Sequence, residues 1–395
     1  VEPTLFLNSA YLGTVLLSLA ALFSAYLIAQ NADSLWRFER PLRWFMLPWG
    51  LIWWFAGGFR ELDRYRPSGY RQFEATNVNE HLFVLFAALS LAALSYLALR
   101  RRWREGLLPG YLLLPLGVVS VIGLDLYWGR TTLFADLGWL AWPLTVATLL
   151  WHLRVSEGFP RLLAAWHAGV WWFVLLLVAW NAAALVAKAL PHSVWTSVVW
   201  GVVPLAGATL LYALRGHSRW PFTAFPQAYF GWGWLVVMVY LLGWLLVTGQ
   251  TAGDPRPLPY LLIVNPLELA QLAILLLGVT WVRQPPQPLG ALRNLAVAVI
   301  AAVGFLWINL TAARAVHFYG GVSYPLEVIL SADSFQTTVS ILWTSIALIL
   351  MGYSARSHMR VSWLVGAALL GLVIVKLFVI DLGKLDTVAR IVSFI

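Results

Sequence analysis

The residues best suited to chemistry lie at the end of an apolar segment: Asn309, Arg314 and His317. Arg314 and His317 are three positions apart, so they lie on one face if the helix continues. A guanidinium binds carboxylate or phosphate through paired hydrogen bonds, and an imidazole exchanges a proton near neutral pH. The spacing therefore favours an anion-binding site. The alternative is an interfacial arginine beside a histidine that is satisfied internally.

A second polar group opens the apolar segment that begins near residue 260. Asn265 is suited to cap a helix, Pro266 to occupy its first position, and Glu268 to complete a capping box. Capping explains Asn265 and Glu268 without any further function. It does not explain Gln271, which lies one turn inside on the face of Glu268. Gln271 is therefore a candidate substrate contact, and Asn265, at the start of the same segment, is kept as a second candidate.

Two charges, Lys376 and Asp381, lie in or at the end of the last apolar segment. A charge at bilayer depth costs about 2.5–3.5 kcal/mol on insertion scales, so such residues usually face the protein interior with a partner. One interpretation is a relay or a substrate contact. The other is a lysine that extends its ammonium group to the lipid headgroups, with Asp381 ending the helix. The sequence leaves both open.

The longest polar stretch, residues 57–81, combines carboxylates, arginines and a histidine. Such a set could supply acid–base catalysis and anion contacts. The alternative is a solvated loop with balanced charge. Its glycine pair, Gly57 and Gly58, permits a close helix approach. The candidates in this stretch are Arg60, Glu61, Asp63, Glu80 and His81.

Several kinds of site are excluded by what the sequence lacks. There is no cysteine, no His-x-x-x-His pair, no phosphate-binding Gly-Lys-Ser/Thr loop and no serine nucleophile elbow. We therefore expect no metal, no cofactor and no direct ATP hydrolysis.

The composition places these residues in a membrane. Of 395 residues, 61% are hydrophobic and 11% charged, whereas a soluble domain has roughly 25% charged residues. The sequence contains apolar runs long enough to cross a bilayer, and their continuity predicts helices, not a β-barrel. The fold class expected is an all-α polytopic bundle, in one transmembrane domain over 1–395. The twelve expected spans are 5–30, 41–59, 80–99, 107–127, 134–152, 161–187, 194–214, 228–247, 260–282, 290–310, 332–353 and 360–381.

The net charge of +9 fits basic residues that orient a membrane protein in the bilayer better than it fits a surface that binds nucleic acid. Arginines concentrate in the loops after the odd-numbered spans, which the positive-inside rule assigns to the cytoplasm. The N-terminus is then expected outside, on the periplasmic face of a bacterial inner membrane. The candidate residues fall on that outer face. The expected partners are membrane lipids and other envelope proteins, and nucleic acid is not expected.

Several of these segments together resemble one protein family. Residues 53–61 read Trp-Trp-Phe-Ala-Gly-Gly-Phe-Arg-Glu, and residues 265–271 read Asn-Pro-Leu-Glu-Leu-Ala-Gln. Together with 306–317, 376–381 and 388–394, they resemble the bacterial multi-pass inner-membrane proteins of domain-of-unknown-function family twenty-three thirty-nine. The resemblance implies that this chain is the C-terminal part of a longer membrane protein. It implies a location and a topology, but no reaction.

Three functions are consistent with the sequence. The leading one is a transporter or flippase-like protein for an envelope-related anionic lipid, sugar or polymer. Arg60 and Arg314 would contact the anion, and Lys376, Asp381 and His317 would supply coupling or gating. The second is a transferase or hydrolase for a lipid-linked substrate, with Glu61, Asp63 or His317 as its acid or base. The third is a structural or assembly subunit of envelope machinery.

Overall fold

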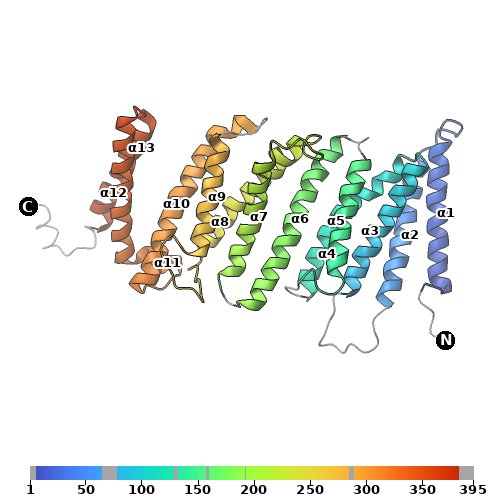
Figure 1. Cartoon of the computed structure of the whole chain (residues 1–395), viewed down its shortest axis with the longest axis horizontal. Coiled ribbons are helices and arrows are strands. Elements are labelled where there is room, and N and C mark those ends of the chain that lie inside the picture. Colours follow the sequence, from blue (N-terminus) through green and yellow to red (C-terminus); the bar gives the residue numbers. More distant parts are fainter. Residues whose placement is uncertain are drawn as a thin grey trace, which may run out of the picture. The chain divides into compact units, whose positions relative to one another are not determined.

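The computed structural model of the chain describes residues 6–64, 78–128, 132–156, 160–191, 193–283 and 289–381. Within these ranges the chain is helical and contains no strand, so the expected all-α class is confirmed. Figure 1 labels the helices and colours them along the sequence. Their bounds are α1 (Ser9–Gln30), α2 (Leu42–Arg64), α3 (Val78–Arg100), α4 (Leu113–Trp128), α5 (Gly138–Val155), α6 (Pro160–Ala189), α7 (Trp195–Leu214), α8 (Trp234–Gly249), α9 (Pro266–Arg283), α10 (Arg293–Gly320), α11 (Leu326–Ser331), α12 (Asp333–Arg356) and α13 (Arg360–Lys376).

Ten helical stretches of the described residues are long and apolar enough to cross a membrane. Each coincides with one of the twelve expected spans. The other two expected spans, 41–59 and 134–152, form the helices α2 and α5. The predicted number is therefore close to the number of spanning helices. Short helices adjoin four of the α-helices. Two are 3₁₀-helices, η1 (Glu105–Leu112) and η3 (Leu289–Leu292), and two are π-helices, η2 (Gln227–Gly233) and η4 (Leu377–Asp381).

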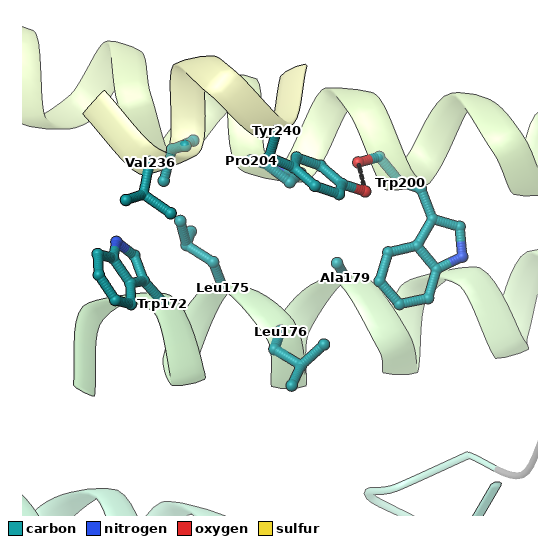
Figure 2. Close-up of a pocket in the computed structure, with 9 residues that line it drawn as sticks. Trp172, Leu175, Leu176, Ala179, Trp200, Pro204, Val236 and Tyr240 are labelled. Carbon is teal, nitrogen blue, oxygen red and sulfur yellow. Dashed lines mark hydrogen bonds between the residues drawn. The ribbon is translucent and has the colours of Figure 1, made fainter. Parts of the chain in front are cut away.

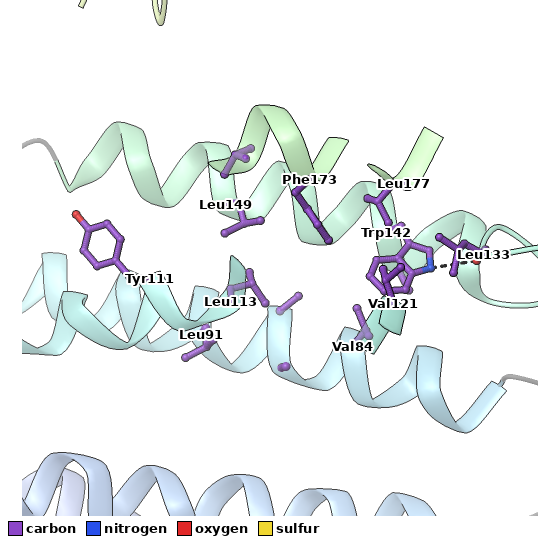
Figure 3. Close-up of a cluster of buried hydrophobic side chains, with 14 of the residues drawn as sticks. Val84, Leu91, Tyr111, Leu113, Val121, Leu133, Trp142, Leu149, Phe173 and Leu177 are labelled. Atoms are coloured by element: carbon purple, nitrogen blue, oxygen red, sulfur yellow. Dashed lines mark hydrogen bonds between the residues drawn. The ribbon is translucent and has the colours of Figure 1, made fainter. Parts of the chain in front are cut away.

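The chain divides into two compact units. The first comprises residues 1–241 with 283–293, and the second comprises 242–282 with 294–395. In the first unit, leucine, valine and aromatic side chains of α3, α4, α5 and α6 form one apolar core. Figure 3 shows Trp142 in this core, donating from its indole Nε1 to the Leu133 carbonyl at 3.0 Å. That bond satisfies the polar edge of a fully buried ring.

Close packing of α1 against α2 depends on small residues. The Ser18 hydroxyl of α1 donates to the Gly50 carbonyl of α2 at 2.8 Å. A methyl group at Gly57 would overlap the Thr14 side chain. Without a hydrophobic force between helices in lipid, small residues permit the contact that holds helices together. The close approach expected at Gly57 is therefore present.

A proline interrupts the hydrogen bonding of α7. Pro204 has no N–H to donate to the carbonyl of Trp200, four residues earlier. The Tyr240 hydroxyl of α8 donates to that carbonyl at 3.0 Å instead. Since water is absent from a bilayer core, such a replacement donor allows a spanning helix to contain proline.

The second unit has its own apolar core around the end of α10. Its buried members come from α10, α11, α12 and the segment between α10 and α11: Ala313, Val316, Tyr324, Ile329, Phe335 and Val339. The helices α12 and α13 lie side by side in this unit (Figure 1). This core holds the end of α10, which carries Arg314 and His317, against the segments around it.

Candidate functional site

The centre of the candidate site is the side chain of Arg314, which is 0% exposed. It lies near the end of α10 and reaches the end of α8. Its Nη2 donates to the Thr248 carbonyl at 3.1 Å and its Nε to the Thr251 carbonyl at 3.3 Å. The last carbonyls of a helix lack donors within the helix. Arg314 therefore supplies both hydrogen bonds and positive charge at the negative end of α8.

Two side chains of α9 complete the surroundings of the guanidinium. Gln271 accepts from Nη1 of Arg314 at 3.2 Å and donates to the Thr248 hydroxyl at 3.0 Å. The Glu268 carboxylate lies 3.9 Å from the same Nη1, and both charged side chains are 0% exposed. Gln271, the side chain that capping does not explain, thus contacts Arg314 directly.

The Glu268 carboxylate has two closer partners than Arg314. The Tyr260 hydroxyl donates to its Oε1 at 2.8 Å, and the backbone N–H of Ile263 donates to its Oε2 at 2.7 Å. The expected capping box is therefore wrong. Glu268 accepts from the backbone N–H of Ile263 and not from that of Asn265, because the chain before α9 folds back over the carboxylate. The hydrogen bonds to this carboxylate thus come from two uncharged donors. The positive charge of Arg314 lies farther from it, at 3.9 Å.

Asn265 caps α9 as predicted. Its Oδ1 accepts from the backbone N–H of Leu267 at 2.9 Å, and its Nδ2 donates to the Gly253 carbonyl at 2.8 Å. Gly253 has a φ of +69°, a conformation that glycine adopts without steric cost. A Cβ there would also lie 3.0 Å from Leu267 and 3.5 Å from Arg314. One asparagine thus joins the start of α9 to the segment that passes over the arginine.

The segments between α8 and α9 and between α10 and α11 carry groups with perturbed pKa values. Burial raises the pKa of Tyr260, and its hydrogen bond to the Glu268 carboxylate raises it further. Burial also raises the pKa of the Tyr324 phenol. Partial burial acts to raise the pKa of Asp254, but hydrogen bonds and charge from Arg256 outweigh it, so that pKa is lowered. The two phenols stay neutral at physiological pH and can act only through hydrogen bonding.

His317 and Asn309 lie on α10 with Arg314, but their side chains bond to other parts of the unit. Nδ1 of His317 donates to the Val322 carbonyl at 2.6 Å, so the ring anchors the turn that follows the helix. Asn309 accepts from the Trp343 indole at 2.8 Å and joins α10 to α12. Arg314 and His317 share the end of one helix, but the hydrogen bonds of each go to different segments.

The ammonium group of Lys376 faces α12. Its Nζ donates to the Gln336 carbonyl at 3.1 Å and to the Ser340 hydroxyl at 2.7 Å, and the residue is 8% exposed. The ammonium group is thus directed toward α12 within the second unit. Asp381 ends η4, and its side chain lies outside the described residues, as do residues 382–395.

The remaining candidates lie in the first unit. The Glu61 carboxylate is buried and accepts from the Asn8 amide at 2.6 Å, from the Phe6 N–H at 3.1 Å and from Arg64 at 3.3 Å. Arg60 and Asp63 are exposed on α2. Residues 65–77 of the polar stretch lie outside the described ranges.

His81 is fully buried near the start of α3. Neither of its ring nitrogens has a hydrogen-bond partner among the residues that the structure describes. Arg60, Glu61, Asp63 and His81 thus belong to one unit, while Arg314, His317 and Lys376 belong to the other.

Sequence reasoning missed the aromatic hydroxyls of this site. Tyr260 supports Glu268, and the Tyr324 hydroxyl donates to the Gly249 carbonyl at 2.9 Å. Both tyrosines lie in segments between helices, where no periodicity marks a buried position. Within the described ranges, no three His, Asp or Glu side chains are placed to hold a metal ion.

The chain matches the family model described as "Predicted membrane protein (DUF2339)" over residues 4–395. It therefore belongs to this family of multi-pass membrane proteins, and the resemblance noted in the sequence is confirmed. Neither the curated proteins nor the solved structures include a match to it.

Proposed function

We propose that this chain is the membrane part of a transporter for an anionic envelope component, such as a lipid or lipid-linked polymer, with Arg314 as the anion-binding charge. The observation that carries the proposal is that a fully buried arginine has no close ion pair with a carboxylate of the described residues. Arg314 lies 3.9 Å from Glu268 and makes its shorter contacts to neutral oxygens.

The loose pairing makes an exchange of partners feasible. Moving Arg314 away from Glu268 leaves the carboxylate with its hydrogen bonds from Tyr260 and Ile263. A substrate phosphate or carboxylate could then bind the guanidinium through two hydrogen bonds, which are stronger than those to neutral carbonyls. In this proposal the structure is an occluded state, and substrate entry opens the segment between α8 and α9 over Arg314.

The proposed location is a bacterial inner membrane, with this site on the periplasmic side. The basis is the distribution of arginines among the loops. The energy source is an ion gradient or a partner protein, because the sequence has no nucleotide-binding loop.

Lipid movement across a vesicle membrane tests the proposal. The protein is reconstituted in vesicles containing phosphatidylglycerol with a fluorescent headgroup label, an ion gradient is imposed across the vesicle membrane, and dithionite quenches the outer leaflet. We expect the protein to accelerate quenching of the inner leaflet. Arg314→Gln should slow it about tenfold, which corresponds to 1.4 kcal/mol. The matched control is Arg360→Gln, at an exposed arginine of the same unit. Equal rates for Arg314→Gln and the unaltered protein would contradict the proposal.

A structural subunit is the second candidate, and one observation favours it. The guanidinium of Arg314 satisfies carbonyls at the end of α8, which is a purely structural task. In that case the protein would give no acceleration over empty vesicles, and Arg314→Gln would lower only its thermal stability. The enzyme hypothesis is favoured less, since the Glu61 carboxylate is already held by Asn8, Phe6 and Arg64 and Nδ1 of His317 by the Val322 carbonyl.

A further inference from the structure

Buried hydrogen-bonding groups without partners gather at the start of α6, in the first unit. The atoms are Nε2 of His167, Nε1 of Trp171 and Nε1 of Trp220, and none has a hydrogen-bond partner among the described residues. His167 itself is 0% exposed. Since buried polar groups are almost always hydrogen-bonded, three such atoms in one region require an explanation.

The three side chains face one segment. His167 and Trp171 are one turn apart on α6, and Nδ1 of His167 bonds the Tyr229 hydroxyl at 2.9 Å. The ring of Trp220 lies 5.8 Å from that of His167. The Cδ1 atom of Trp171, bonded to its Nε1, faces Gly233. His167 and Trp171 of α6 therefore face residues 220–233, and Trp220 belongs to that facing segment.

These atoms can act together as donors. An indole nitrogen only donates. When the Tyr229 hydroxyl donates to Nδ1 of His167, the hydrogen of the neutral ring is on Nε2, which then also donates. Three unsatisfied N–H groups call for a ligand rich in acceptor oxygens. Arg154 adds positive charge, because its guanidinium lies over the Trp220 ring at 5.5 Å.

A separate apolar groove lies further along the same helix, and its lining does not include the three donors. It has a volume of about 190 Å³ and is lined by Trp172, Leu175, Leu176 and Ala179 of α6, Trp200 and Pro204 of α7, and Val236, Val237 and Tyr240 of α8. Figure 2 shows the α6 side chains facing those of α7 and α8 across it. Leu175 continues the stripe of His167 and Trp171 on α6. From His167 to Ala179 the helix rises about 18 Å.

We propose that one anionic glycerophospholipid binds here. Residues 220–233 move aside to admit its headgroup, because the three nitrogen atoms are buried in the closed arrangement. Its phosphate and ester oxygens then accept from His167, Trp171 and Trp220, and one acyl chain lies in the groove. The occupant follows from the surroundings, because the groove lies in α6, α7 and α8, which are long and apolar enough to cross a membrane. An apolar cavity of roughly 150 Å³ stays dry and takes an apolar guest, so water does not fill this groove.

This site is separate from Arg314, which belongs to the other unit, and does not rest on the transport proposal. Binding of a single phospholipid here would hold the segment 220–233 against α6. The lipid would thereby become a part of the folded first unit.

Native mass spectrometry with phosphatidylglycerol tests the proposal. The purified full chain is delipidated, given phosphatidylglycerol, and released from its micelle. We expect one retained lipid per chain. The double variant Trp171→Phe/Trp220→Phe removes two donors and keeps the ring shapes, and should lower retention at least fivefold. The variant Ala179→Phe, which fills the groove, should do the same. The matched control is Trp232→Phe, at an exposed tryptophan of η2, and should retain the lipid.

Two results would overturn the proposal. One is undiminished retention in both the double variant and Ala179→Phe. The other is retention of a lipid-linked sugar in place of phospholipid by protein purified without delipidation, which the retained mass identifies. Thermal melting of each variant, measured alongside, must match the control, so that lost binding is not lost folding.

Discussion

The buried pair of Arg314 and Glu268 is costly to maintain, because both charges have left water. Arg314→Met should lower the free energy of unfolding by about 3–5 kcal/mol, since it leaves the buried Glu268 carboxylate without its positively charged partner. Unfolding in detergent with a chemical denaturant measures this change. Arg360→Met, at an exposed position, should have little effect.

The same pair should be energetically coupled. The double variant Arg314→Met/Glu268→Gln should be more stable than the sum of the single losses predicts, by at least about 1 kcal/mol. The coupling stays smaller than the single losses because Tyr260 and Ile263 also hold Glu268. Strict additivity would mean that the two charges do not interact at 3.9 Å.

Titration of Tyr260 should limit stability at alkaline pH. Its folded-state pKa is raised by burial and by Glu268. A raised pKa means that the folded state holds the proton more tightly, so the contribution is complete below the ordinary value of 10.0 and is lost as the pH rises above it. Melting temperatures between pH 8 and pH 11, about one unit beyond the ordinary tyrosine pKa, measure this loss. Tyr260→Phe should fall less steeply above pH 10; an identical slope would exclude Tyr260 as the cause.

At the scale of the helix, the bond from Tyr240 to Trp200 should matter only because of Pro204. Tyr240→Phe leaves a carbonyl without a donor, which costs about 1–3 kcal/mol. Adding Pro204→Ala restores an N–H four residues after Trp200, so the double variant should recover most of that stability. Thermal melting in lipid nanodiscs compares the three variants. If Pro204→Ala fails to rescue Tyr240→Phe, the hydroxyl contributes by packing and not by replacing the missing donor.

Helices of this chain are much easier to predict than the contacts of its site. Continuous apolar runs identify spans because a bilayer demands about 20 such residues in a helix. Asn265 is predictable as a cap because capping is local in sequence. The backbone partners of Arg314 are not predictable, because Thr248 and Thr251 contribute carbonyls, which every residue has. Nothing local indicated that Glu268 would bond Ile263 and not complete the capping box.

At the scale of the whole molecule, the sequence offers a direct test of topology because it contains no cysteine. Single cysteines can therefore be introduced without background and labelled with a membrane-impermeant maleimide. If the N-terminus faces the periplasm, Leu258→Cys should react in intact cells. Ser34→Cys, Arg102→Cys and Gly216→Cys should react only after permeabilisation. All four positions are exposed in the structure.

These positions also test whether α2 and α5 cross the membrane. Between residues 34 and 102 the chain passes through α2 and α3, so the two cysteines share a face only if both helices cross. Between 102 and 216 it passes through α4, α5, α6 and α7, and the same reasoning applies to α5. Labelling of Arg102→Cys from the outside, with Ser34→Cys protected, would show that α2 does not cross. The full reverse of the expected pattern would place the Arg314 site on the cytoplasmic side, where it could not receive a periplasmic substrate.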